Sequence, residues 1–282
     1  MRKILASPAL CGLVLCGLAA PCLLAQSNLF TDLQHRAARA QSTQPSWSVP
    51  LNQPYPMLIQ VFRFDSGRQI TPTHAYNVNY GVSKGLNIIP GFNSEFDFYP
   101  PSYFEHNSTS RDGFGDPTFG YKYRIASGNE AHGNYAVSMQ LFATIPTGSY
   151  SNGSPDAVLT PTFEAGKGFG KFDVISTLAG SLPTGDTIKI GRTIAWNTTA
   201  QYKLHKYFFP ELESNATWFH GGKNDGKSQN FLEPGLTTAK FKIHPGNESA
   251  RAGFAFGGGI QIATSSFHTY DHQLVFTSRF IF

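Results

Sequence analysis

The last eleven residues, HQLVFTSRFIF, alternate between large apolar and polar side chains. The apolar positions are Leu274, Phe276, Phe280 and Phe282, and the polar positions between them are Gln273, Thr277 and Arg279. A period of two predicts a β-strand with one apolar and one polar face. A soluble sheet usually leaves a few frayed polar residues beyond such a strand, whereas this sequence stops on a bulky aromatic residue.

The same alternation runs from Met57 to the end of the sequence. Clear examples are YAVSMQLFATI (135–145), FGYKYRI (119–125) and TIAWNTTAQYKL (193–204). We predict strands at 57–66, 74–83, 86–98, 113–125, 135–146, 157–166, 171–182, 193–204, 207–219, 229–243, 251–263 and 270–282. Each is near the ~10 residues with which a tilted strand crosses a bilayer. For 229–243, either parity could face outward.

The first residues have the layout of a secretory signal. Arg2 and Lys3 precede an apolar run, and we expect residues 1–25 to be removed by cleavage after Ala25. This part contains the three cysteines of the sequence, Cys11, Cys16 and Cys22. The mature chain would then have no thiol, which excludes disulfides, thiolate metal sites and cysteine nucleophiles.

Composition argues against nucleic-acid binding and against membrane helices. Without Arg2 and Lys3 the 22 basic residues fall to 20, against 18 acidic ones, a net charge of +2. The chain has no basic tract of the kind that binds nucleic acid. Charged residues make up 14% of the sequence, against roughly 25% in soluble domains. Yet no mature stretch approaches the ~20 apolar residues of a membrane helix, so alternating strands are the better prediction.

The apolar faces could belong to a soluble sandwich or to a membrane barrel. In a sandwich they meet in a core, whereas in a barrel they face lipid and the polar faces enclose a lumen. The signal segment, the many long strands and the aromatic end favour the barrel. An open sheet edge in lipid costs several kcal/mol for each unpaired backbone group, so the last strand must seal against the first.

We therefore predict an all-β fold: an antiparallel transmembrane β-barrel over residues 57–282. It has about twelve strands, with ten to fourteen allowed, and both termini in the periplasm. Short connections such as KGFG, HK and SKG alternate with long polar ones such as PTGSYSNGSPD and PPSYFEHNSTSRD. This difference is typical of the two rims of an outer-membrane barrel.

Residues 26–56 do not share the alternation. They contain several Gln, Ser and Pro residues, which predicts a flexible periplasmic segment with one short helical turn around Leu29–Ala38. A plug or a partner-binding tail is the alternative interpretation.

The aromatic alternation ending in Phe280 and Phe282 resembles the end of Gram-negative outer-membrane barrels, where this segment is the signal for the barrel-assembly machinery. GFGDPTFGYKYRI (113–125), the PTG strand exits and AGFAFGGGIQI resemble one group, the transporter family named for the meta-pathway of phenol degradation. The resemblance covers about residues 57–282. It implies a small channel for uptake of aromatic or other hydrophobic compounds. The partners would be outer-membrane lipid, the assembly machinery and a small-molecule solute, with no cofactor.

Polar residues on the predicted inner face are the candidates for lining a lumen. They are Lys122, Arg124, Gln140, Asp173, Asn197, Gln201, Lys203, Glu211, Glu213, Gln261 and Arg279. They could select solutes, or the charges could simply pair to stabilise the barrel.

An enzyme on the same fold would need a nucleophile and a base. HTYDH supplies His268, Asp271 and His272 shortly after Ser265 and Ser266, but no Gly-x-Ser-x-Gly elbow occurs. The spacing also matches no closed metal site. We predict no catalytic, cofactor or metal residues.

The prediction is thus a passive outer-membrane channel of a Gram-negative bacterium, not an enzyme and not a nucleic-acid binder. A non-conducting barrel with a structural or surface-binding role is the alternative, its lumen blocked by side chains or by residues 26–56. A membrane esterase or lipase is a third hypothesis.

Overall fold

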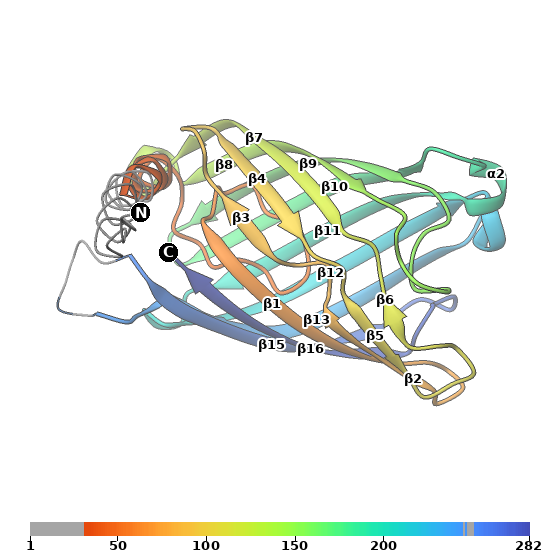
Figure 1. Cartoon of the computed structure of the whole chain (residues 1–282). Coiled ribbons are helices and arrows are strands. Elements are labelled where there is room, and N and C mark those ends of the chain that lie inside the picture. Colours follow the sequence, from red (N-terminus) through yellow and green to blue (C-terminus); the bar gives the residue numbers. More distant parts are fainter. Residues whose placement is uncertain (1–30, 245, 247–250) are drawn as a thin grey trace, which may run out of the picture.

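The strands form one antiparallel sheet that closes on itself. The computed structural model describes residues 31–244, 246 and 251–282, so the predicted signal segment 1–25 lies outside the described residues. Strand β16 (His272–Ile281) pairs with β1 (Val61–Ile70) on one side and with β15 (Gly253–Ala263) on the other. The result is a closed barrel of 12 antiparallel strands (Figure 1), which confirms the predicted fold.

The other strands follow one another around the barrel in chain order, some of them interrupted. They are β2 (Tyr76–Gly81), β3 (Leu86–Ile88), β4 (Ser94–Tyr99), β5 (Tyr103–His106), β6 (Gly113–Phe114), β7 (Thr118–Gly128), β8 (Tyr135–Thr144), β9 (Val158–Phe169), β10 (Phe172–Pro183), β11 (Arg192–Tyr202), β12 (Phe208–His220), β13 (Ser228–Thr238) and β14 (Phe241–Lys242). The helices are residues 31–41, η1 (Glu130–His132), α2 (Thr187–Ile190) and η2 (Gly222–Asn224). None of the described helices is long and apolar enough to cross a membrane.

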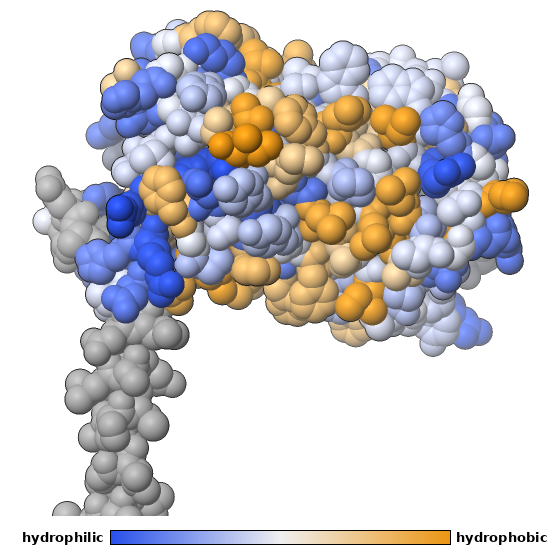
Figure 2. Space-filling view, turned by 90° about the horizontal axis from the view of Figure 1, so that it is seen from above, coloured by the Kyte–Doolittle hydropathy of each residue, from blue (hydrophilic) through white to orange (hydrophobic). Residues whose placement is uncertain are grey.

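The apolar face of each strand points outward. In β7, Tyr121 keeps 43% of its surface exposed, whereas the adjacent Lys122 keeps 2%. Trp196 on β11 is 56% exposed, and Figure 2 shows apolar residues in a band between two hydrophilic ends. Such a band would be unfavourable in water and suits hydrocarbon. The barrel therefore spans a membrane with a polar interior.

The two rims differ as predicted. Tight connections such as 170–171 and 203–207 lie at one rim, and the longer connections with α2 and η2 lie at the other. The helix at 31–41 and the end of β16 lie at the tight-turn rim (Figure 1). We call the opposite one the outer rim.

The predicted strands 74–83 and 86–98 are wrong in their bounds. The predicted turn SKG (83–85) lies within an interruption of one strand over residues 82–85. β2 and β3 are both antiparallel to β1 and so run in the same direction. The turn lies at 89–93, and β5 occupies part of the predicted long loop. The interruption depends on Gly85, where a Cβ atom would lie 2.4 Å from the Phe98 carbonyl oxygen.

The orientation that the sequence left open for 229–243 is settled by β13. Leu232 and Leu236 are exposed, at 37% and 42%, whereas Glu233 and Thr237 are fully buried. The polar parity therefore faces the lumen in this strand as well.

Candidate functional site

Residues 44–58, which we call the plug, enter the lumen from the tight-turn rim and return to β1. They form neither helix nor strand. Leu51, Met57 and Leu58 are at most 1% exposed, and Val49 and Tyr55 are 7% exposed. This placement differs from the flexible periplasmic segment expected over 26–56. The segment is held because the lumen wall offers partners to its backbone groups.

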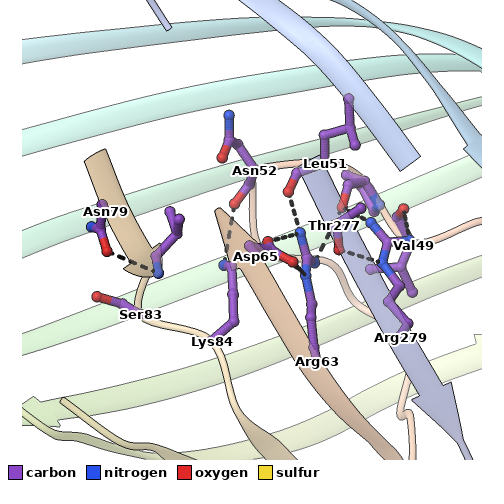
Figure 3. Close-up of polar contacts among 12 residues, drawn as sticks. Val49, Leu51, Asn52, Arg63, Asp65, Asn79, Ser83, Lys84, Thr277 and Arg279 are labelled. Carbon is purple, nitrogen blue, oxygen red and sulfur yellow. Dashed lines mark hydrogen bonds and ion pairs between the residues drawn. The ribbon is translucent and has the colours of Figure 1, made fainter. Parts of the chain in front are cut away.

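Residues 49–52 form the tip of the plug, and two arginines bind the carbonyl groups of its first three residues (Figure 3). Arg279 on β16 donates from Nη1 to the Val49 oxygen at 2.6 Å and from Nη2 to the Pro50 oxygen at 2.9 Å. Arg63 on β1 donates to the Pro50 oxygen at 3.2 Å and to the Leu51 oxygen. Both guanidinium groups are buried, so these carbonyl groups take the place of solvent.

Three glutamates bind the donors of the same tip. The Leu51 N–H donates to Glu211 Oε1 at 2.9 Å, and the Asn52 N–H donates to Glu213 Oε1 at 3.1 Å. The Asn52 side chain donates from Nδ2 to Glu233 Oε2 at 2.5 Å. The wall thus presents cations to the plug carbonyls and carboxylates to its N–H groups.

The plug itself carries no charged side chain. Its peptide dipoles therefore compensate much of the charge that is buried in the wall. Ion pairs within the wall compensate more of it, such as Arg63 with Asp65 at 2.6 Å. Hydrogen bonds to charged groups contribute about 1.5–3 kcal/mol each. Removing the plug would leave those charges to water or to a solute.

Leu51 fits a socket made of glycines. A Cβ atom on Gly235, Gly257 or Gly259 would lie 2.3, 2.9 or 2.7 Å from a Leu51 methyl carbon. A side chain at any of these positions would force the Leu51 side chain to move. The wall is therefore shaped for this residue.

The returning half of the plug is held by β7 and β8. Lys122 Nζ donates to the Tyr55 oxygen at 2.8 Å and lies 4.2 Å from the centre of the Tyr55 ring. Ser138 Oγ donates to the Pro56 oxygen at 2.6 Å. Lys122 also pairs with Glu95 at 3.3 Å. The two halves of the plug also share a contact, because Val49, Tyr55 and Met57 pack in one cluster with Ile175 on β10.

At the tight-turn rim, two contacts anchor the entry of the plug. Arg124 donates to the Ala40 oxygen at 2.7 Å and to Gln44 Oε1 at 2.8 Å. Glu130 in η1 accepts from the Ser46 N–H at 2.9 Å and from Ser46 Oγ at 2.6 Å. Partial burial acts to raise the pKa of Glu130, but these hydrogen bonds outweigh it and lower the pKa.

Cavities lie on both sides of the plug tip. One of about 270 Å³ lies toward the tight-turn rim, beside Trp47, Met57 and Phe209. Another of about 290 Å³ lies toward the outer rim, beside Asn215 and Tyr270. The lumen is therefore interrupted by the plug between two hollow regions.

The predicted lumen residues are mostly brought together around the plug. Those buried inside the barrel are Lys122, Arg124, Gln140, Asp173, Gln201, Glu211, Glu213, Gln261 and Arg279. Asn197 is half-buried and lines the outer cavity. Lys203 is exposed beyond the end of β11, where its N–H donates to the Lys171 oxygen at 2.7 Å. Phe280 lies on the outer face, its ring 5.2 Å from that of Phe254 and 5.8 Å from that of Phe282.

Several inward-facing charges were not predicted from the sequence. They are Arg63, Asp65, Glu95, Asp97, Glu164 and Glu233, all buried. The alternation of VFRFD (61–65) was a sufficient signal for the first two. Glu233 was missed because the parity of its strand was undecided, and nothing in the sequence pairs any of these charges with the plug.

The histidine cluster near the outer rim is a loop contact. His268 Nε2 lies 3.0 Å from Asp271 Oδ1, but the Ser265 hydroxyl donates to the Phe267 oxygen at 2.7 Å. In the part of the chain that the structure describes, no three metal-ligating side chains lie together.

Two solved structures resemble this chain. The COG4313 outer membrane channel from Pseudomonas putida F1 has a TM-score of 0.51 and 13% identity, covering 84% of this chain and 100% of that one. NanC porin has a TM-score of 0.49 and 9% identity, covering 78% of this chain and 98% of that one. No curated protein matches the sequence.

The closed barrel with a lipid-facing apolar band is the architecture of Gram-negative outer-membrane proteins, and this chain is an outer-membrane β-barrel. The family model described as "Putative MetA-pathway of phenol degradation" matches residues 67–267, more than half of the sequence. The chain therefore belongs to that family.

Proposed function

We propose that the protein is a passive channel for small solutes, and that the plug determines whether its lumen is open. The observation that carries this proposal is the pair of cavities separated by the plug tip. The tip is held by hydrogen bonds from side chains of the wall. Such contacts can exchange with water, so the segment can leave without refolding of the strands. Solutes would then diffuse down their gradient.

The proposed solutes include aromatic or other hydrophobic compounds, on the ground that the family description names phenol degradation. The proposal of a channel is supported by the similarity in fold to a protein called an outer membrane channel. We propose no catalytic role, since the Ser265 hydroxyl is engaged away from His268. Release of a chromogenic ester by purified protein would contradict this.

We also propose the cellular context of the barrel. Residues 1–25 would direct export, both termini would face the periplasm, and the tight-turn rim would be the periplasmic one. Phe280 and Phe282 would be recognised by the barrel-assembly machinery.

Planar-bilayer recording tests the channel. Replacing residues 46–55 with a flexible Gly-Ser linker of equal length should remove the tip and leave every strand intact. We expect stepwise currents several-fold larger than those of the wild type. The matched control replaces the outer loop 221–227 in the same way and should leave the conductance unchanged.

The alternative is a barrel that does not conduct and serves as a structural or surface-binding protein. The buried plug favours it, because a well-satisfied segment would close the lumen permanently. Heat-modifiable gel migration shows whether the linker variant is a folded barrel. If the folded variant gives no current, the channel function is contradicted and this alternative is supported.

A further inference from the structure

The cavity on the outer side of the plug is lined mainly by primary amides. It has a volume of about 290 Å³ and lies between the plug tip and the outer ends of β11, β12, β13, β15 and β16. The amides are Asn52, Asn197, Asn215, Gln229, Gln261 and Gln273. We call this cavity the amide vestibule. A solute arriving from outside would meet it before the plug.

The vestibule presents no ionised side chain, although charges lie just beneath it. Glu233 is fully buried, and its Oε2 accepts from Asn52 Nδ2 at 2.5 Å and from Gln261 Nε2 at 3.1 Å. These two amides therefore cover the carboxylate. The buried charges of the lumen hold the plug, whereas the lining of the vestibule is neutral.

One side of the vestibule is aromatic. The Tyr270 ring stacks on the Phe231 ring at 4.4 Å between centroids and 14° between planes. The Tyr270 hydroxyl donates to Gln261 Oε1, which fixes the ring toward the amides. The cavity thus combines a flat apolar surface with directed polar groups, the combination that small-molecule sites use.

Some of the amides have hydrogen-bonding capacity left over. Asn215 Nδ2 is buried and has no partner among the described residues. Gln273 Oε1 accepts from Gln69 Nε2 at 2.8 Å, while no described residue accepts from its own amide nitrogen. A buried donor without a partner costs about 1–3 kcal/mol, which a bound acceptor would recover.

We propose that the amide vestibule binds a neutral, hydroxyl-rich ring molecule of monosaccharide size. Hydroxyl groups both donate and accept, as primary amides do, and the face of a pyranose ring can pack on Tyr270. An ionised solute would lose its hydration and find no opposite charge there. This goes beyond the aromatic or hydrophobic solutes proposed above, because it assigns a second, hydroxyl-rich class to the vestibule. It rests on the channel function only for passage, since binding is measured separately.

Isothermal titration of the folded full-length protein tests this with three congeners. Neutral glucose should bind, whereas glucosamine and glucuronate, of opposite charge, should bind at least tenfold more weakly. Binding of either charged congener as tight as that of glucose, or no binding of glucose, would overturn the proposal. So would binding of phenol in preference to glucose, since phenol has the flat face without the hydroxyl groups.

Two variants locate the site. Asn215→Leu removes the amide at nearly constant size, and Tyr270→Ala removes the flat surface; each should weaken glucose binding at least tenfold. Asn224→Ala, on the outer loop and outside the cavity, is the control and should bind as the wild type does. Heat-modifiable migration identifies folded protein, and unchanged glucose binding in both folded variants would contradict the assignment. Glucose binding without conductance would contradict only the proposed channel function. Conductance without glucose binding would contradict only the proposed vestibule site.

Discussion

At the scale of single residues, the fit of Leu51 to its glycine socket determines how firmly the plug docks. A Cβ atom on Gly235 would lie 2.3 Å from a Leu51 methyl carbon, and its next contact is the Gly258 oxygen at 3.3 Å. Gly235→Ala should therefore displace the plug and raise the open fraction in bilayer recordings. Leu51→Ala should also weaken docking, by about 2–5 kcal/mol as for other buried leucines.

The two substitutions should compensate each other. In the double variant the added methyl group occupies space that Leu51 vacates, so the closed fraction should exceed that expected from adding the single effects. If the open fraction of the double variant equals the value expected from adding the two single effects, the socket does not recognise Leu51.

Glu130 should make the entry of the plug sensitive to acid. Its pKa is lowered when the plug is docked, through the Ser46 hydrogen bonds and the nearby Lys203. A lowered pKa stabilises docking above the ordinary carboxyl pKa of about 4.3, and this contribution is lost as pH falls through the docked value. Trp47 emission, followed after Trp196→Phe and Trp218→Phe, should shift to longer wavelength as the pH falls below the ordinary carboxyl pKa.

Glu130→Gln retains an acceptor for Ser46 but removes the titration. The acid-induced shift of Trp47 emission should then disappear. Any remaining difference from the wild-type emission should be smaller and independent of pH. An identical acid shift in this variant would assign the titration to another group.

At the scale of elements, strands were predictable where alternation is unbroken. β8, β10, β11 and β12 lie within two residues of their predicted bounds because each alternates from rim to rim. The prediction failed over 74–98 because a glycine-containing interruption resembles a turn in sequence. Only the pairing with β1 shows that β2 and β3, before and after Gly85, run in the same direction, and those contacts are not local.

Gly85→Ala should destabilise this part of the barrel. The added methyl group would meet the Phe98 oxygen at 2.4 Å and Pro100 at 2.6 Å, and backbone cannot move aside as a flexible side chain can. The temperature at which the folded gel band is lost should fall by several degrees. Gly180→Ala, where nothing lies within 4 Å of the new Cβ atom, is the control and should leave it unchanged. Equal temperatures for the two variants would contradict the role given to Gly85.

At the scale of the whole molecule, the sequence predicted the polar lumen but not what fills it. Lys122 and Arg279 were identified from strand parity alone. The plug was only an alternative, since residues 44–58 show neither a period of two nor one of 3.6. Their conformation is determined by wall charges from β1, β7, β12, β13 and β16, which no local pattern can reveal.

The closed lumen depends on a neutral N-terminal segment, residues 44–58, that is docked inside the membrane barrel. Amide hydrogen exchange of the full chain in lipid nanodiscs tests it most directly, because the Leu51, Asn52 and Leu58 N–H groups donate to buried acceptors. Peptides covering 47–58 should exchange as slowly as those of β12. Exchange of 47–58 as fast as that of the exposed loop 107–112 would show that the plug is not docked.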